Sequence, residues 1–209
     1  MKYFIAAISL AVSIPSFGQF NKGDKVLGGT LSLSTAKNEN SQYAYLNSNS
    51  TSFVIYPNFG VLVNSNLELG GQLGYSSNRN ESSAINASSD RKSNYLTAGF
   101  HIRRYFVISD KFLFSLIGNI SYSVGKDKTV LTNQNVIEEN QTKGKNIGLT
   151  FGPSFIFFPS LNWGLQASIG NLGYTTFKNK TTDDTSYQFG INYGYVGLGV
   201  AYYFRGSVE

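Results

Sequence analysis

The 209-residue chain contains no cysteine and only one histidine. Without cysteine it can form no disulfide, zinc ribbon, thiol nucleophile or lipid-modified cysteine after a leader. Charged residues make up 14% of the chain, against about 25% in typical soluble domains. The net charge of +5 is mild, and the basic residues lie singly or in pairs, so nothing indicates a nucleic-acid partner.

Long hydrophobic runs are also missing, apart from one short segment at the N-terminus. Residues 1–18 have the pattern of a signal peptide: Lys2, a mostly apolar segment, Pro15, and small residues at Ser16 and Gly18. A core helix or membrane anchor is the alternative, but crossing a membrane takes about 20 apolar residues. We expect cleavage before Gln19, which leaves residues 19–209 as one mature domain.

The chain is rich in glycine, tyrosine and phenylalanine, with 22, 14 and 16 residues. Apolar and polar residues alternate with a period of two in one segment after another, which is the pattern of β-strands. Eight strands are predicted, at Lys25–Ser34, Ser52–Leu62, Leu67–Ser76, Ser93–Val107, Lys111–Gly125, Lys145–Phe158, Asn162–Phe177 and Tyr187–Phe204.

The two faces of these strands decide the class of barrel. One face is apolar and carries no charge in four of the strands, whereas the other holds mainly glycine, serine, asparagine, threonine and glutamine. Each Lys or Arg at the midplane of a lipid-facing surface costs about 2–4 kcal/mol, which explains the missing charge. The pattern predicts an all-β, eight-stranded antiparallel up-and-down transmembrane β-barrel with a narrow polar lumen.

The connections support this prediction because short and long segments alternate, as in outer-membrane barrels. Three-residue turns are expected at 64–66, 108–110 and 159–161, and long polar loops at 35–51, 77–92, 126–144 and 178–186. The short turns would place Phe106 opposite Phe112 and Phe157 opposite Trp163, in an aromatic girdle with Phe158. A change of phase in the last strand predicts a β-bulge near Gly194 or Tyr195.

Several segments resemble a known family. Tyr56–Val63 followed by Leu67–Gly70 and Leu73–Tyr75 is similar to the second hairpin of the small outer-membrane β-barrel domain family, the OmpX/OmpA-like barrels, and closest to versions from Bacteroidetes-type bacteria. Arg103–Phe106 resembles the segment before its next turn. The resemblance implies a protein of the outer membrane of a Gram-negative cell.

The last strand resembles the signal read by the barrel assembly machinery. Gly199, Tyr202 and Phe204 match that signal, whereas Gly197 stands at its polar position and departs from it. Arg205–Glu209 extend past the terminal aromatic residue, where such signals usually stop. The resemblance implies that these residues serve assembly.

Three polar residues are candidates for chemistry inside the barrel. His101 falls on the lumen side, either as a hydrogen-bonded polar residue or as part of a Ser/His/acid set, for which the sequence assigns no serine. Glu68 and Arg103 also face the lumen, and we expect them to form a structural charge pair because an unpaired buried charge is costly.

The predicted role is structural or interactive, with outer loops for adhesion or ligand contact and a mostly plugged lumen. A narrow small-solute channel is the alternative, and a lipid-modifying enzyme is the less favoured one. We expect that the protein is not an enzyme and that it binds no cofactor and no metal. The expected partners are outer-membrane lipid, lipopolysaccharide and the barrel assembly machinery, with no nucleic acid, and the protein is expected to be a monomer.

Overall fold

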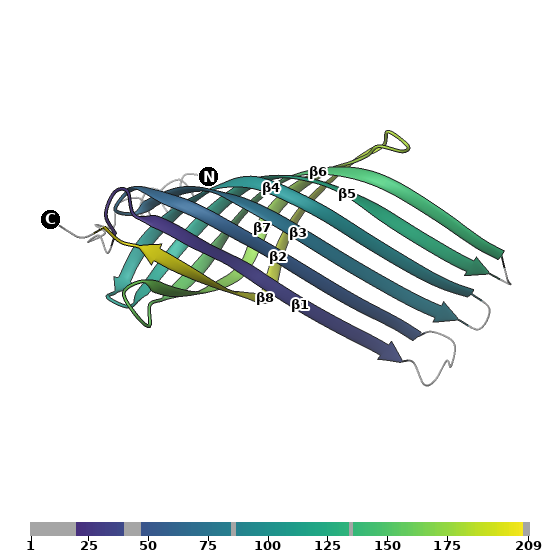
Figure 1. Cartoon of the computed structure of the whole chain (residues 1–209), viewed down its shortest axis with the longest axis horizontal. Helices are drawn as coiled ribbons and strands as arrows, with labels where there is room; N and C mark the ends of the chain where they lie inside the picture. The colour runs from purple at the N-terminus through teal and green to yellow at the C-terminus, as the bar shows by residue number, and fades with distance from the viewer. Residues whose placement is uncertain (1–19, 40–46, 85–86, 134–135, 207–209) are drawn as a thin grey trace, which may run out of the picture.

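The computed structural model describes residues 20–39, 47–84, 87–133 and 136–206, so the predicted signal peptide lies outside the described residues. Eight antiparallel strands follow one another around a closed barrel, in the up-and-down order that the sequence predicted (Figure 1). The strands are β1 (Lys25–Glu39), β2 (Asn47–Asn64), β3 (Leu67–Ala84), β4 (Ala87–Ser109), β5 (Phe112–Asn133), β6 (Val136–Phe157), β7 (Trp163–Asn179) and β8 (Thr185–Phe204).

The short connections all lie at one end of the barrel, which we call the turn end. They span residues 65–66, 110–111 and 158–162, and the start of β1 pairs with the end of β8 there. Two predicted cross-strand pairs are wrong. Phe106 lies opposite Phe114, and not opposite Phe112, because the β4–β5 turn lies at residues 110–111 and not at 108–110 as expected. Leu165, and not Trp163, lies opposite Phe157, because the connection is longer than three residues.

Three of the four predicted long loops, at 35–51, 77–92 and 126–144, are mostly strand, so the expectation is wrong for these, whereas the fourth loop is present at residues 180–184. β3 continues to Ala84 and β4 begins at Ala87, which leaves only residues 85–86, outside the described part, between them. Serine, asparagine and threonine occupy both faces of these segments, so the sequence shows no alternation there although the backbone ladder continues. We call the outer part of β1–β6 the extension; it comprises residues 36–39, 47–50, 80–84, 87–91, 129–133 and 136–140.

The barrel is closed near the turn end and opens toward the extension. β1 and β8 pair only from Lys25–Gly29 with Val200–Phe204, and beyond these residues the two strands separate (Figure 1). The predicted bulge is present, since residues 193–195 of β8 lie opposite Gly170 alone, between the pairs Ile169–Val196 and Asn171–Asn192. Gly170 has φ of +64°, a conformation that favours glycine.

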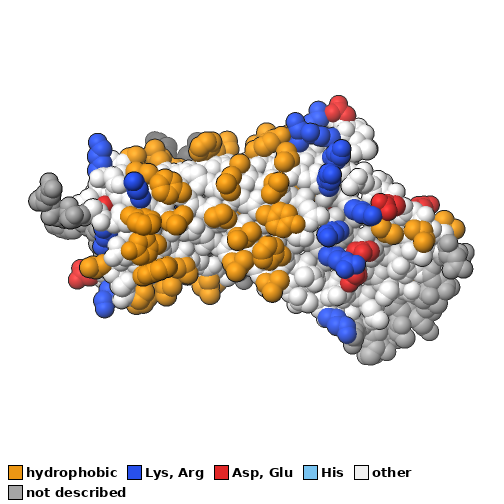
Figure 2. Space-filling model, in the orientation of Figure 1, with side chains coloured by type: hydrophobic (Ala, Val, Ile, Leu, Met, Phe, Trp, Pro, Cys, Tyr) orange, Lys and Arg blue, Asp and Glu red, His pale blue; other side chains and the backbone are white. Residues whose placement is uncertain are grey.

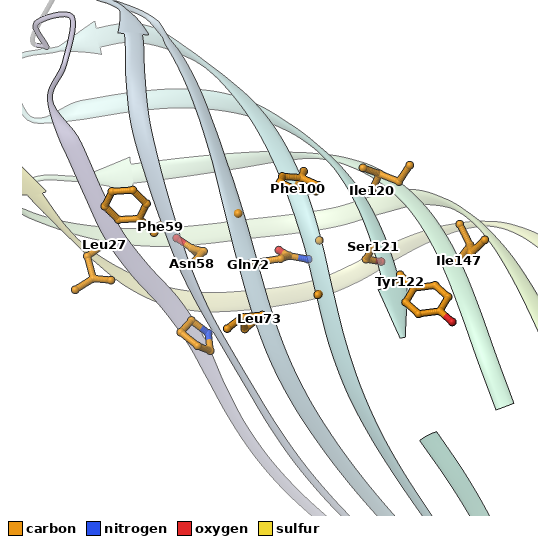
Figure 3. A pocket seen from close by; sticks show the side chains of 14 residues that line it. Leu27, Asn58, Phe59, Gln72, Leu73, Phe100, Ile120, Ser121, Tyr122 and Ile147 are labelled. Atoms are coloured by element: carbon orange, nitrogen blue, oxygen red, sulfur yellow. The ribbon is translucent and has the colours of Figure 1, made fainter. Parts of the chain in front are cut away.

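The outward surface of the barrel is apolar over a broad band (Figure 2). Large hydrophobic side chains such as Leu73, Phe100 and Leu198 are 65–74% exposed. Small residues leave an apolar groove of about 780 Å³ in this surface, where Gly71 lies between Phe59 and Phe100 in the register (Figure 3). Within the described ranges, no helix is long and apolar enough to cross a membrane.

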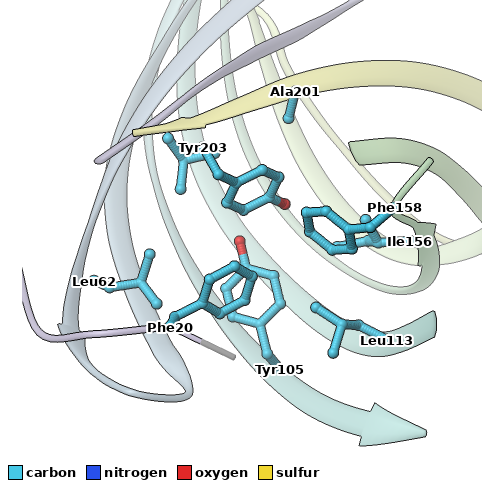
Figure 4. Close-up of a cluster of buried hydrophobic side chains, with 9 residues drawn as sticks. Phe20, Leu62, Tyr105, Leu113, Ile156, Phe158, Ala201 and Tyr203 are labelled. Carbon is cyan, nitrogen blue, oxygen red and sulfur yellow. The ribbon is translucent and has the colours of Figure 1, made fainter. Parts of the chain in front are cut away.

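The buried core fills the inside of the turn end (Figure 4). Phe20, which precedes β1, lies among Tyr105 of β4, Phe158 and Tyr203 of β8. Phe158 was expected in the outer aromatic girdle, but it is 4% exposed and points inward, because it follows the buried Ile156 by two residues and so keeps the inward phase of β6. We call Phe20, Tyr105, Phe158 and Tyr203 the aromatic plug.

Candidate functional site

A cluster of polar side chains adjoins the aromatic plug on the inside of the barrel. Glu68 comes from β3, and His101, Arg103 and Tyr105 come from β4. The three β4 residues are two apart, so they share the inward face. Glu68 is the direct cross-strand partner of Arg103, and this register brings the four side chains together.

Glu68 is the centre of this cluster, because both of its carboxylate oxygens have partners. Its Oε1 atom lies 2.7 Å from Nε2 of His101, and its Oε2 atom accepts a hydrogen bond from the hydroxyl of Tyr105. Nη1 of Arg103 lies 3.8 Å from Oε2. The side chains of Glu68, His101 and Arg103 are at most 5% exposed, so the cluster is withdrawn from bulk solvent.

Two glycines make room for this cluster. Gly60 of β2 and Gly70 of β3 are cross-strand partners on the inward face. A Cβ atom at Gly60 would lie 2.1 Å from Oε1 of Glu68, and one at Gly70 would lie 2.4 Å from the His101 ring. The residues at these positions must therefore lack a side chain for Glu68 and His101 to meet.

The aromatic plug covers the cluster at the turn end. The rings of Phe20 and Tyr203 are stacked, with centroids 5.1 Å apart and planes at 11°. The guanidinium of Arg205 lies 5.2 Å from the ring centroids of both Phe20 and Phe158, within range of a cation–π interaction. Asp24 accepts hydrogen bonds from the backbone of Asn21 and Gly206, which ties the two chain ends to this region.

Arg103 is the least satisfied member of the cluster. Its Nε and Nη1 atoms are buried and have no hydrogen-bond partner among the described residues, although its guanidinium lies 5.9 Å from the Tyr105 ring centroid. Glu68 is therefore its counter-ion through charge and not through a hydrogen bond. Removing that carboxylate would leave a buried cation without compensation.

Sequence reasoning found part of this site. It placed Glu68, His101 and Arg103 on the lumen side, and the structure brings all three into contact. It did not connect His101 with Glu68, although the shared face of residues 101, 103 and 105 is a signal that could have done so. Glu68 is the partner at Nε2 of His101, which corresponds to the acid–His half of such a set, and among the described residues no serine is hydrogen-bonded to His101.

The three residues of the predicted assembly signal lie where β8 closes the barrel. Gly199 faces inward, close to the backbone oxygen of Gly29. Tyr202 and Phe204 face outward, and Tyr202 contacts the rings of both Phe204 and Trp163, at centroid distances of 4.7 and 5.1 Å. The geometry describes an outward aromatic group beside the closing strands.

No known protein family and no curated protein matches the sequence. Among solved structures, the chain is similar to the translocator domain of the autotransporter NalP from Neisseria meningitidis, with 10% identity, 96% of this chain and 94% of that chain covered, and a TM-score of 0.26. It is also similar to the outer membrane protease OmpT from Escherichia coli, with 9% identity, 92% and 99% coverage, and a TM-score of 0.30.

The second of these similarities corrects one prediction. We expected a barrel that is not an enzyme, but a protease, OmpT, is among the structures similar to this chain, which contradicts that expectation. At a TM-score of 0.30 the likeness assigns no activity to this chain either. We therefore withdraw the expectation that the protein is not an enzyme.

Proposed function

We propose that the protein is an integral outer-membrane barrel that is plugged at its turn end and presents the extension to the exterior for contact with a partner. The observation that carries this proposal is the broad apolar band on the outward surface, which charged side chains border on both sides (Figure 2). A hydrocarbon environment accommodates so many exposed large apolar side chains around a barrel.

The proposal also assigns a sidedness and a subtype. In outer-membrane barrels the periplasmic turns are short and the outer loops are longer. The turn end would therefore face the periplasm. Eight strands in up-and-down order support the OmpX/OmpA-like subtype. In this proposal residues 1–18 direct export, and Gly199, Tyr202 and Phe204 serve the barrel assembly machinery.

The extension is the part available to a partner. Its inward face carries a hollow of about 580 Å³, lined by residues of β3–β6 that include Ser82, Ser89, Leu131 and Glu138. Hydroxyl, carboxylate and apolar groups together can bind a polar ligand or a protein segment. Contact with a ligand or another cell is therefore the role that we propose for this face.

Single-cysteine variants test location and sidedness, because the chain has no cysteine of its own. Ser82→Cys lies in the extension and Ser160→Cys in an exposed turn at the turn end. A maleimide that cannot cross membranes should label the first in intact cells, and the second only after the outer membrane is permeabilised. Recovery of the protein in the soluble fraction, without heat-modifiable gel mobility, would contradict the proposal.

A further inference from the structure

A row of lysines runs around the outward surface at the border of the apolar band. In β5 the outward residue Val124 is followed by Lys126, and in β6 Lys145 precedes the outward Ile147. Two residues along a strand span about 7 Å, so the lysine ammonium groups lie directly beside the edge of the apolar band. This row consists of Lys92, Lys126, Lys128, Lys143, Lys145 and Lys178. Figure 2 shows Lys and Arg side chains gathered along this border of the apolar band.

The lysines of the row are paired with one another across the strands. Like charges directly opposite one another destabilise a sheet. Three such pairs occur side by side on β4–β7, namely Lys92 opposite Lys128, Lys126 opposite Lys143, and Lys145 opposite Lys178. The repeated arrangement places a local excess of positive charge on the outer surface of the barrel.

The carboxylates of the protein neutralise only part of this charge. Lys128 forms an ion pair with Glu139, and Lys178 with Asp183. Among the described residues, none of the other four lysines lies within ion-pair distance of a carboxylate: Lys92, Lys126, Lys143 and Lys145. An anionic partner from outside the chain would remove the repulsion.

We propose that this row binds the phosphate groups of anionic lipid headgroups in the outer leaflet. The inference rests on the proposed membrane location, because the row lies where headgroups would lie beside the apolar band. Basic residues near an anionic membrane surface attract its lipids, and a row of opposed lysines matches a layer of phosphates in charge. The binding class is thus a phosphate-bearing lipid, held at the rim of the barrel.

The test uses the full mature chain, Lys126→Gln/Lys143→Gln, and a control, Lys25→Gln/Lys111→Gln, which removes two exposed lysines at the turn end. Each is inserted into bilayers of phosphatidylcholine with or without phosphatidylglycerol, and the urea midpoint of unfolding is measured. For the wild type, phosphatidylglycerol should raise the midpoint. The double variant should unfold at higher urea than the wild type in the neutral bilayer and at lower urea in the anionic one, whereas the control should keep most of the gain.

Each other outcome overturns the proposal in a distinct way. If phosphatidylglycerol raised the urea midpoint of the wild type and of Lys126→Gln/Lys143→Gln by the same amount, the row would bind no headgroup. If the control variant lost as much of this rise as the row variant does, the effect would be one of overall charge. If inorganic phosphate, at ionic strength matched with chloride, reproduced the gain in the neutral bilayer, the ligand would be a free anion. Failure of all three proteins to insert would instead overturn the proposed membrane location, and the lipid site with it.

Discussion

The turn end and the extension are built from the same eight-stranded sheet but are held together by different interactions. At the turn end, Glu68, Tyr105 and Tyr203 are fully or almost fully buried. In the extension most side chains are polar and exposed. Asp90 of the extension is 40% exposed in its side chain, and its ion-pair partner Arg79, which directly precedes the extension on β3, is 53% exposed. Packing and buried charge stabilise one end, whereas backbone pairing dominates the other.

This difference assigns separate roles to stability and to contact. Substitutions at the turn end should change the free energy of unfolding of the whole barrel, because their cost follows from burial. Substitutions in the extension should change local order or ligand contact and leave the barrel folded.

The largest effect is expected from Glu68→Gln. The amide keeps the size of the side chain but removes the negative charge that Glu68 places beside Arg103, which should lower the free energy of unfolding by about 3–5 kcal/mol. Urea unfolding followed by the fluorescence of Trp163, the one tryptophan of the chain, measures this change. The control Glu81→Gln removes the exposed partner of Arg79, and its midpoint should equal that of the wild type within error. Equal effects of the two would erase the difference between the two ends.

Phe20→Ala should be the next most damaging change. Loss of a buried phenylalanine costs about 3–5 kcal/mol, and we expect the low end of this range because Phe20 precedes the first strand. Ile137→Ala, at a residue of the extension that is 71% exposed, should change stability by less than about 0.5 kcal/mol.

The same variant tests the plug as a barrier. If the aromatic plug blocks the lumen, the wild type should not conduct ions in a planar bilayer, and Phe20→Ala should increase conductance. A wild-type protein that conducts steadily would favour the narrow small-solute channel instead.

A smaller effect is expected from Gly70→Ala. Its Cβ atom would lie 2.3 Å from the backbone oxygen of Phe59 and close to the His101 ring, so the substitution should cost about 1–3 kcal/mol. Gly190→Ala is the matched control, since no heavy atom lies within 4 Å of a Cβ atom there. Urea midpoints of the two variants measure the difference, and a Gly70→Ala barrel as stable as the control would show that the cluster tolerates displacement of His101.

The sequence predicted the part of the fold in which each strand has one apolar face. Leu67–Ser76 was identified because Leu69, Leu73 and Tyr75 alternate with small or polar residues, whereas Ser77–Ala84 was missed because both faces there are polar. Hydrophobic periodicity detects a strand where its two faces differ in polarity, and it gives no signal where both faces are polar, even if the backbone is paired. For the same reason, the sequence did not predict that the strands continue through the extension.

The sequence predicted those features of the candidate site that depend only on which face of a strand a residue occupies. The period of two placed Glu68 and Arg103 on the same side, and the position of the β3–β4 connection placed them near one another. Phe20 gave no such signal, since it lies outside any strand and is held by rings from β4, β8 and the segment after β6 and by the Arg205 guanidinium. Contacts of this kind depend on tertiary packing, which a local pattern does not contain.

The smallest predicted effect concerns Asp90, and it tests whether the extension responds to pH separately from the barrel. Hydrogen bonds from Arg79, at 2.8 and 3.1 Å, hold the pKa of the Asp90 carboxyl below its usual 3.8. A carboxyl whose pKa is lower in the folded state stabilises the fold at pH values above its pKa in the unfolded state. This contribution is lost as the pH falls through its pKa in the folded state. Arg79→Gln should therefore raise the Asp90 pKa toward 3.8 in a carbon-13 NMR titration and leave the global urea midpoint at pH 7 unchanged. A lower midpoint would mean that the exposed pair stabilises the whole barrel, and an unmoved pKa would mean that the pair does not form in solution.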